Sequence, residues 1–487
     1  MRPLQPVQIE AMDPRRFEPL ISSGDYQDLL ALIGRASALL HGRVIWNVNS
    51  TAAGGGVAEL LRTLLGYSRG GGVDARWLVI SGGPAFFEVT KRIHTHLHGF
   101  DADGRGLGEP ERAIYEGTLA ENAAELVPMV HPEDIVILHD PQTAGLVDAL
   151  GRTGAAVIWR CHVGADNPNA YVHEAWSFLR RYVRNADAYV FSRAQFAWDG
   201  LDPRKIAVIH PSIDPFSAKN QDQTPAQTLA ILRRAGILRD GGAEHGTFTH
   251  GDSTPGRIDR PATLLEAEPL APGDRFIVQV SRWDGLKDPL GVIAGYARYI
   301  ANRTDAHLVL GGPAADSVAD DPEGAAVIGL VRDAWHRLPD AIQSRVHVAS
   351  LPMTDVGENA AIVNALQRRA AVVVQKSIAE GFGLTVAEAM WKERAVVAGA
   401  VGGIQDQIVD GQSGVLLSDP HDLESFGMAV VDLLEDRELA ERIGVAAHVR
   451  IRNEFLAPRH LGRHFELIER VLSERDRKRR MTVWAPT

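Results

Sequence analysis

The chain runs Val44-Ile45-Trp46-Asn47-Val48, then Asn49-Ser50-Thr51-Ala52-Ala53-Gly54-Gly55-Gly56, and then a helical pattern from Val57 to Leu65. An apolar run, a glycine-rich turn and a helical segment are typical of a strand that leads into a helix. The glycines let the backbone approach a ligand, and the N–H groups of a helix N-terminus favour an anion. The loop is neither G-x-G-x-x-G nor a Walker A motif, which argues against a dinucleotide dehydrogenase or a P-loop NTPase. A tight turn without a ligand is the alternative.

The same alternation continues along the chain. Apolar runs of strand length lie at 77–80, 135–138, 155–160, 188–191 and 206–209, and then at 276–280, 307–310, 346–348, 371–374 and 395–398. Such runs, separated by helix-length segments, predict an α/β protein with two doubly wound parallel sheets. Two facing Rossmann-like domains of this kind place strand carboxyl ends on both sides of an interdomain cleft, where ligands bind.

The periodicity fails between about Ser217 and Asp274. There a short helix (Thr228 to Leu238) precedes Gly241-Gly242 and a polar stretch from Thr247 to Ser253. We therefore expect a first domain at 1–216, a linker with an insertion at 217–274, and a second domain at 275–455. The last segment, 456–487, is predicted to be a helix that packs back on the first domain.

The composition excludes several classes of protein. Of 487 residues, 45% are hydrophobic and 23% charged, which is typical of a soluble globular protein. The net charge of −11 argues against a general binder of nucleic acid or anionic membrane. A single cysteine, Cys161, excludes an intrachain disulfide and favours a reducing compartment. With no secretory signal pattern and no apolar run of spanning length, we expect a cytoplasmic protein.

Two cations follow a predicted strand within Ser281-Arg282-Trp283-Asp284-Gly285-Leu286-Lys287-Asp288. Arg282 and Lys287 on one strand-to-helix loop could clamp a diphosphate, because both donate charge-assisted hydrogen bonds to phosphate oxygens. The alternative is a solvated loop that carries exposed charges.

Two carboxylates lie eight residues apart in Glu380-Gly381-Phe382-Gly383-Leu384-Thr385-Val386-Ala387-Glu388-Ala389-Met390. The N–H groups of the glycine loop can bind sugar hydroxyls or phosphate oxygens. Glu388 can accept two ribose hydroxyls, and its apolar neighbours indicate a buried carboxylate that needs a partner. The alternative is an ordinary loop followed by an ordinary helix carboxylate.

This E-x7-E pattern resembles the signature of the retaining family-four glycosyltransferases with the GT-B fold. Arg282 and Lys287 lie where that family has its phosphate-clamping pair. The stretch from Val401 to Gly414 is similar to its downstream G-G-x-x-(D/E) block, with the acid one position late at Asp406.

The N-terminal half resembles the trehalose glycosyltransferring synthases within that family. The similar pieces are Asn49-Ser50-Thr51, Gly54-Gly55-Gly56-Val57-Ala58-Glu59, Arg76-Trp77, Phe86-Phe87, Val89-Thr90-Lys91, His139-Asp140-Pro141-Gln142, Trp159-Arg160-Cys161-His162 and Pro211-Ser212-Ile213-Asp214-Pro215. The resemblance covers about Arg43 to Phe455. It departs at an insertion near Arg239 to Asp274 and at an extra N-terminal segment of about 40 residues, so acceptor access and oligomer contacts stay open.

The resemblance implies a retaining hexosyltransferase that makes α,α-trehalose from a nucleoside-diphosphate glucose and glucose, reversibly and without a metal or other cofactor. It implies catalytic roles for Arg282, Lys287, Glu380 and His162. It implies donor-binding roles for Gly55, Gly56, Gly381, Phe382, Gly383, Leu384, Thr385 and Glu388, and acceptor-binding roles for Asp140 and Asn49. His162 would contact the 6-hydroxyl of the donor sugar, and no residue is an obvious covalent nucleophile.

Alternative readings stay open at this point. The rival functions are a trehalose phosphorylase, a related retaining hexosyltransferase with another acceptor, and a non-catalytic sugar-nucleotide sensor. A core histidine is the alternative for His162, and a helix cap is the alternative for Asp140, since Pro141 suits a first helical position. A homodimer is one option for the assembly.

Two weaker features carry metal-like spacing. His94 and His98 lie four residues apart with His96 between them, and we interpret them as part of a surface or subunit-contact helix rather than a metal site. Asp101-Ala102-Asp103 imitates the metal motif of another glycosyltransferase fold, but it lies in a glycine-rich loop and not after a strand. We interpret it as incidental.

Overall fold

The computed structural model describes residues 4–52, 55–239, 245–251, 253–314 and 322–483. Contacts divide the chain into two units. Unit 1 comprises Met1–Ser212 and Phe455–Thr487, and unit 2 comprises Ile213–Glu454. The chain therefore passes from unit 1 through unit 2 and ends in unit 1.

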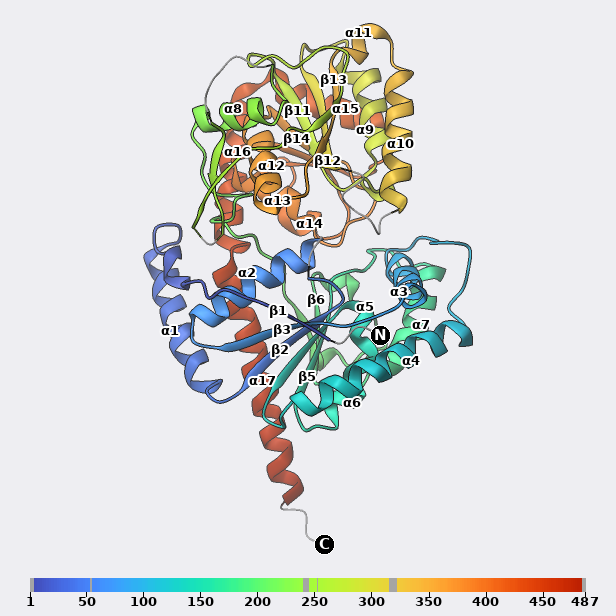
Figure 1. The fold of residues 1–487 in the computed structure, drawn as a ribbon, viewed down its shortest axis with the longest axis vertical. Coiled ribbons are helices and arrows are strands. Elements are labelled where there is room, and N and C mark those ends of the chain that lie inside the picture. The colour runs from blue at the N-terminus through green and yellow to red at the C-terminus, as the bar shows by residue number, and fades with distance from the viewer. Residues whose placement is uncertain (1–3, 53–54, 240–244, 252, 315–321, 484–487) are drawn as a thin grey trace. The chain divides into compact units, whose positions relative to one another are not determined.

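Unit 1 is built on a seven-stranded sheet of order β1-β3-β2-β4-β5-β6-β7 (Figure 1). Its strands are β1 (Gln5–Val7), β2 (Val44–Asn49), β3 (Asp74–Val79), β4 (Ile135–His139), β5 (Ala156–Cys161), β6 (Ala188–Phe191) and β7 (Ile206–Val208). The edge strand β1 is antiparallel to β3, and the other pairs are parallel. The central strands are buried on both faces, which explains their continuous apolar runs.

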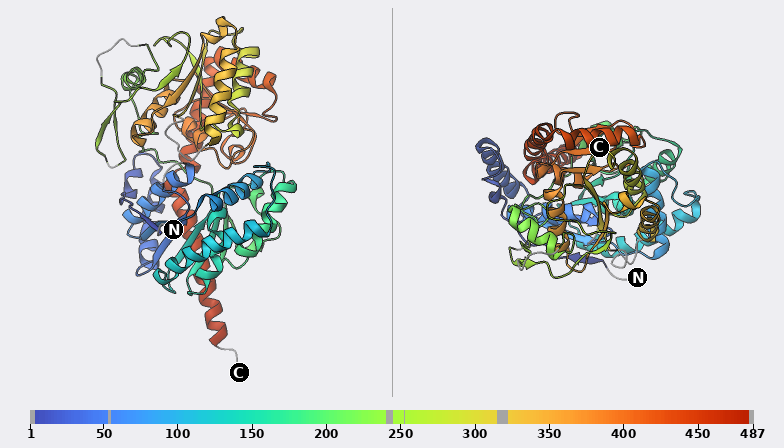
Figure 2. Two further views of the ribbon diagram at one scale, coloured as in Figure 1. Left: turned by 45° about the vertical axis from the view of Figure 1, so that its right-hand side comes forward. Right: turned by 90° about the horizontal axis from the view of Figure 1, so that it is seen from above.

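Helices cover both faces of this sheet. They are α1 (Ser23–Leu39), α2 (Gly56–Gly70), α3 (Pro84–Leu97), α4 (Glu109–Leu126), α5 (Asp140–Thr143), α6 (Val147–Gly151), α7 (Ala170–Val183) and α17 (Ala457–Val483). On one face the core joins Phe86 of α3 to Trp176 of α7. On the other face Ile45 and Ile137 pack with Phe465 and Ile468 of α17, which also contacts α1 and α2. Figures 1 and 2 show α17, in red, beside this sheet.

Unit 2 is built on a second seven-stranded sheet, of order β10-β13-β12-β11-β14-β15-β16. Its strands are β10 (Thr263–Leu265), β11 (Phe276–Val280), β12 (His307–Pro313), β13 (Val346–Leu351), β14 (Val372–Gln375), β15 (Val396–Gly399) and β16 (Val415–Leu417). Only the edge strand β10 is antiparallel among these pairs. Its helices are α8 (Pro225–Arg234), α9 (Pro289–Gly295), α10 (Pro322–His336), α11 (Asp340–Gln343), α12 (Val356–Arg369), α13 (Leu384–Trp391), α14 (Ile404–Gln407), α15 (Leu423–Glu435) and α16 (Arg437–Glu454).

Each sheet has a topological switch point, where the chain leaves two neighbouring parallel strands in opposite directions. In unit 1 it lies between β2 and β4, and in unit 2 between β11 and β14. Ligands of doubly wound folds bind beyond the strand carboxyl ends at such points. The predicted fold class, two Rossmann-like α/β sheets, is confirmed.

The segment 217–274 is more structured than a linker. It contains α8, which packs on α12, the hairpin of β8 (Thr247–Thr249) and β9 (Pro255–Arg257), and β10. Buried Glu358 accepts the backbone N–H groups of Asp259 and Arg260, at 2.7 and 2.6 Å, which ties the insertion to α12. The predicted turn at Gly241-Gly242 lies outside the described residues.

Among the helices that the structure describes, none combines the length and the apolar character needed to cross a membrane.

Candidate functional site

The loop after β11 and the loop after β14 meet at the switch point of unit 2. Lys287 Nζ lies 2.5 Å from Glu380 Oε2, and both side chains are mostly buried, at 14% and 13% exposure. Asp284 caps the short 3₁₀ helix that carries Lys287 by accepting the Leu286 N–H at 2.8 Å. The structure thus brings together a predicted phosphate-binding cation and a predicted sugar-binding carboxylate from two separate loops.

Arg282, the other predicted clamp residue, is 59% exposed and pairs with Asp284 Oδ2 on its own loop, at 3.3 Å. The two cations therefore have different carboxylate partners. Arg282 needs only a change of rotamer to leave this exposed pair, which is weak in water.

The backbone next to Lys287 is strained. Asp288 has φ 49°, in the left-handed region that costs a non-glycine residue about 1–3 kcal/mol. Its carboxylate accepts the Gly291 N–H at 2.9 Å and forms an ion pair with the fully buried Lys376. Gln279 Nε2 donates to the Lys287 carbonyl at 2.8 Å. These contacts hold the loop in the conformation that presents Lys287.

The glycine loop from Glu380 to Gly383 packs closely on a second backbone segment. Gly383, with φ 85°, is the N-cap of α13. A Cβ on Gly402 would lie 1.7 Å from the Glu380 carbonyl oxygen, so only glycine fits there. Gln407 Nε2 donates to the Phe382 carbonyl at 2.5 Å. The downstream glycine block therefore supports the predicted donor loop.

Glu388, on α13, is 1% exposed, and Lys219 Nζ lies 3.4 Å from its Oε1. Lys392 is one turn further along the helix and is also buried. Its ammonium donates to the Glu388 carbonyl at 3.0 Å, to Gln367 Oε1 at 2.8 Å and to Asn220 Oδ1 at 3.0 Å. Lys219 therefore lies beside the buried carboxylate that the sequence singles out, and Lys392 bonds the backbone of the same residue.

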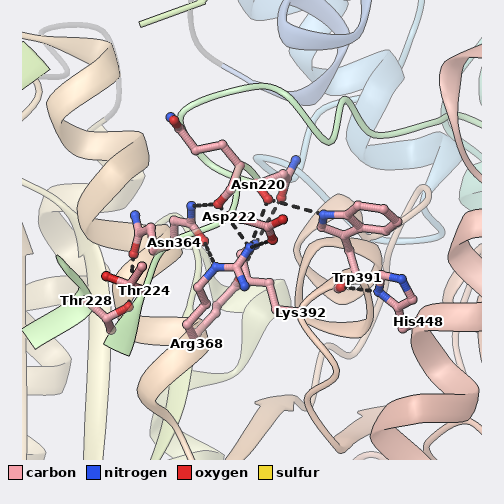
Figure 3. A network of polar contacts seen from close by, with 12 residues as sticks. Asn220, Asp222, Thr224, Thr228, Asn364, Arg368, Trp391, Lys392 and His448 are labelled. Carbon is pink, nitrogen blue, oxygen red and sulfur yellow. Dashed lines mark hydrogen bonds and ion pairs between the residues drawn. The ribbon is translucent and has the colours of Figure 1, made fainter. Parts of the chain in front are cut away.

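A polar network ties the segment around Asn220 to α12 and α13 (Figure 3). The Asn220 carbonyl accepts hydrogen bonds from Trp391 Nε1 and Arg368 Nη2, both at 3.2 Å. Arg368 also reaches Asp222 Oδ1 at 3.0 Å, and Figure 3 shows Lys392 pointing into the same cluster. The network fixes the neighbourhood of Lys219 against the helix that carries Glu388.

At the carboxyl end of β4 in unit 1, Asp140 has φ 63°. Its Oδ1 accepts the N–H of His162, at the end of β5, at 2.7 Å, and its carbonyl accepts Trp159 Nε1 at 3.1 Å. Burial raises the pKa of Asp140 to about 7, although the His162 N–H opposes this shift. No side-chain hydrogen bond caps α5, and the Asp140 carboxylate accepts an N–H from the neighbouring strand end instead, which does not favour the helix-cap alternative.

His162 is 7% exposed and begins a chain of buried side chains. Its Nε2 lies 3.1 Å from His139 Nδ1, and His139 Nε2 lies 3.1 Å from Asn47 Oδ1. Burial lowers the pKa of His162 well below its usual range and that of His139 to about 3, so both rings stay neutral near pH 7. His162 is thus a buried histidine that also holds the predicted acceptor residue Asp140.

Asn49 has both ends of its side chain engaged in the protein. Its Oδ1 accepts Trp77 Nε1 at 2.8 Å, and its Nδ2 donates to the Thr51 carbonyl at 2.7 Å. Asn49 therefore shapes the glycine loop. Gly55, with φ 81°, is the N-cap of α2, and Gly56 is its first residue. Ala53 and Gly54 of this loop lie outside the described residues.

The weaker metal-like features have structural partners. Asp103 pairs with the buried Arg92 at 2.8 Å, and His96 with Glu174 at 3.4 Å, while the rings of His94 and His98 contact each other. In the described part of the chain, no group of three or more histidines, cysteines and carboxylates is suited to a metal ion.

Sequence reasoning missed several residues of both sites. Lys392 follows Glu388 by four residues, and this helical spacing could have suggested it. Lys219, Lys376, Asp288 and Asn47 gave no signal, because their importance depends on tertiary contacts between distant segments.

Two stretches of the chain match known protein families. Residues 47–198 match the trehalose synthase N-terminal domain, and residues 263–450 match glycosyl transferases group 1. The trehalose synthase of Thermococcus litoralis is 35% identical over 423 residues, which are 87% of this chain and 89% of the relative. The chain belongs to the trehalose synthase family.

Further relatives extend this assignment. The trehalose synthase of Rubrobacter xylanophilus is 34% identical over 459 residues, or 94% of this chain and 96% of that one. The trehalose phosphorylase of Grifola frondosa is more distant, with 25% identity over 83% of this chain and 54% of its own. The crystal structure of an α,α-trehalose 6-phosphate synthase from Burkholderia multivorans has a TM-score of 0.64 at 13% identity, covering 91% of this chain and 99% of that one.

This trehalose synthase family member is therefore a hexosyltransferase with the GT-B fold, related to trehalose synthases and, more distantly, to trehalose phosphorylases. The resemblance noted in the sequence is confirmed for family, fold and enzyme class. The likeness to the phosphate synthase concerns the fold alone, because the two sequences are only 13% identical.

Proposed function

We propose that this chain transfers glucose, with retention of configuration, from a nucleoside-diphosphate glucose to glucose, giving α,α-trehalose, and that it runs this reaction reversibly. The observation that carries the proposal is the contact between Lys287 and Glu380 at the switch point of unit 2. From this position, the cation can bind the diphosphate of a nucleotide sugar and the carboxylate can bind its sugar.

The departing diphosphate gains negative charge as the bond to the anomeric carbon breaks. Lys287 and Arg282, together with the N–H groups at Gly383 to Thr385, would stabilise this charge. Glu380 would then accept the 3- and 4-hydroxyls of the transferred sugar. Fixed cations and backbone amides can replace a divalent metal in this role, so we propose that turnover needs none.

The nucleotide ribose would bind at Glu388. Lys219 accompanies this buried carboxylate, and two ribose hydroxyls can replace that contact. A ribose contact serves a nucleotide-dependent transferase, whereas a phosphorylase uses free phosphate and has no ribose to bind. Glu388 therefore favours the transferase over the phosphorylase named among the distant relatives.

In unit 1, Asp140 would bind the acceptor glucose and His162 would bind the donor sugar. A carboxylate orients two hydroxyls, and His162, neutral and buried, can hydrogen-bond the 6-hydroxyl of the donor sugar. The acceptor hydroxyl would lose its proton to the leaving phosphate oxygen while its own oxygen bonds to the anomeric carbon. The proposal therefore needs neither a covalent nucleophile nor a protein general base.

Incubation with ¹³C-labelled glucose and ADP-, UDP- or GDP-glucose, read by NMR, tests the proposal. A non-reducing α,α-linked disaccharide with one of these donors supports it, and Lys287→Ala is the control that should abolish most of the signal. Trehalose with inorganic phosphate is the rival reaction. Formation of glucose 1-phosphate, with no product from any nucleotide sugar, would overturn the proposal in favour of a phosphorylase. We further propose that the protein is cytoplasmic and forms a homodimer.

A further inference from the structure

Unit 1 contains a cavity of about 80 Å³ between its sheet and the helices α1, α2 and α17. Most of the lining is aliphatic or aromatic. It includes Ile33 and Ala36 of α1, Leu64 and Ser68 of α2, Phe465 of α17 and Asn47 of β2. One water needs roughly 10–15 Å³. The cavity can therefore hold several waters or one small organic molecule.

Asn47 brings an unsatisfied polar group to this apolar space. Its side chain is 1% exposed, and its Nδ2 makes no hydrogen bond to any described residue. Burying an amide donor without an acceptor is costly, and native structures rarely leave one unpaired. A ligand with a hydrogen-bond acceptor would satisfy this donor, whereas a hydrocarbon would not.

The other end of the Asn47 amide leads towards the acceptor residues. With Asn47 Oδ1 accepting the His139 Nε2–H, the neutral His139 must accept at Nδ1, and His162 Nε2–H is the donor there. His162 in turn donates its backbone N–H to Asp140. Hydrogen bonds through the buried side chains of His139 and His162, and then through the His162 backbone, thus link the cavity wall to Asp140.

We propose that this cavity is an effector site for a small, mainly apolar molecule with a carbonyl or ether oxygen that accepts a hydrogen bond from Asn47. Ligand binding in the cavity changes the KM for the acceptor sugar through His139 and His162. This coupling rests on the proposed function. The apolar walls disfavour charged or polyhydroxylated molecules, glucose included. Helix α1, which forms one wall, precedes the residues that match the trehalose synthase domain, so the wall lies outside that match.

Cyclopentanone is a suitable probe for binding to the full-length chain, with cyclopentane as the matched hydrocarbon. We expect saturable signals in ligand-observed NMR and a rise of the melting temperature with ketone concentration. Cyclopentane should bind about fivefold more weakly, since it leaves Asn47 unpaired. Absence of saturable ketone binding, as for a cavity that holds only water, would overturn the proposal.

Variants locate the binding. Ala36→Leu fills the cavity from α1 and should abolish ketone binding, whereas Ala31→Leu, on the exposed side of the same helix, should leave it intact. Ser68→Leu makes the same test from α2 if Ala36→Leu does not fold. Binding that survives both cavity-filling changes would place the ligand elsewhere and refute the assignment.

Kinetics test the coupling. Saturating cyclopentanone should change the KM for glucose by about fivefold while the nucleotide Kd stays constant, and Ala36→Leu should remove the effect. Ketone binding with an unchanged KM would refute the coupling alone. If glucose proves not to be an acceptor, the proposed function fails, but the binding measurements still decide whether the cavity is a ligand site.

Discussion

At the switch point of unit 2, charged side chains from different loops pair with one another, as Lys287 does with Glu380 and Lys376 with Asp288. At the switch point of unit 1, Asp140 and His162 belong to a chain of hydrogen-bonded groups whose histidines are buried and neutral. The first arrangement suits a ligand that is itself charged, because its phosphates can replace one ion-pair partner. The second suits hydroxyls, which are recognised by directional hydrogen bonds. The difference predicts that mutations in the two units will affect different steps.

The largest expected effect is that of Lys287→Ala. Removing a charge that acts mainly on the leaving diphosphate should lower both kcat and kcat/KM by roughly a hundredfold to a thousandfold, the cost of one oxyanion donor. Steady-state kinetics with nucleotide sugar and glucose measure it, and the exposed Arg303→Ala is the control in the same unit. A raised KM with unchanged kcat would assign Lys287 to ground-state binding instead.

Arg282→Ala should also lower kcat and kcat/KM, but the loss should be about tenfold smaller than the loss caused by Lys287→Ala. The Arg282 side chain is 59% exposed and must be ordered when the donor binds, which offsets part of its contribution. Equal losses for the two variants would show that Arg282 is held as firmly as Lys287, and an enzyme unaffected by both changes would reject the clamp.

Glu388→Ala should weaken nucleoside-diphosphate binding by roughly tenfold or more, because charge-assisted bonds to ribose are lost. Calorimetry measures the affinity directly. Helix α13 should persist, since alanine favours helices, and Glu388→Gln, which keeps the shape, should lose less. Unchanged affinity in both variants would remove Glu388 from the donor site and favour the phosphorylase alternative.

Asp140→Asn should weaken glucose use and leave nucleotide binding unchanged. Because burial raises the pKa of Asp140 to about 7, its ionised form is gained as the pH rises through 7, and kcat/KM for glucose should rise there. The Asp140→Asn variant should not show this rise of kcat/KM near pH 7. Asp199 is an exposed aspartate of unit 1, and Asp199→Asn should still show the rise. A reducing disaccharide as the wild-type product would refute the trehalose assignment but not the transferase.

The same raised pKa has a consequence for stability. Below about pH 4, Asp140 is protonated in both the folded and the unfolded state, and its contribution to the free energy of unfolding is fully present. This contribution is lost as the pH rises through about 7, because the folded state resists ionisation of Asp140. Chemical denaturation of the wild type and Asp140→Asn at pH 5 and pH 8 should show the variant gaining relative stability at pH 8. A constant difference between the two would mean that Asp140 titrates normally.

The smallest expected effect is that of metal removal. EDTA should leave turnover nearly unchanged, because fixed cations and helix amides would stabilise the leaving group in place of a metal. A loss of roughly tenfold or more that Mg²⁺ or Mn²⁺ restores would contradict the proposed metal independence.

The sequence was sufficient for the sheets because buried parallel strands read as continuous apolar runs. The predicted run at 276–280 is strand β11, and that at 44–48 is β2 with one added residue. Strands β1, β10 and β16 and the hairpin of β8 and β9 were missed, and each of these strands is only three residues long. The equally short edge strand β7 was predicted because its apolar run extends through Ile209. Such edge strands depend on their partners more than on their own composition.

For the candidate site, residue types were easier to predict than contacts. The sequence singled out Lys287, Glu380 and Glu388, but not the ion pair between the first two or the approach of Lys219. Nothing in the sequence showed that Asp140 and Asp288 take left-handed backbone conformations, which glycine usually adopts. Tertiary contacts hold both residues there, and a single sequence does not display those contacts.

The position of α17 has a consequence for how the protein is made. Phe465 and Ile468 complete the core against Ile45 and Ile137, and His460 and His464 cover the buried Arg160, yet these partners are separated by all of unit 2. At roughly 5–20 residues per second, the ribosome takes on the order of 10–50 seconds to synthesise the 242 residues from Ile213 to Glu454. During that interval the nascent unit 1 exposes an apolar face that only the last stretch of chain can cover, and chaperones that bind such faces would be needed most then.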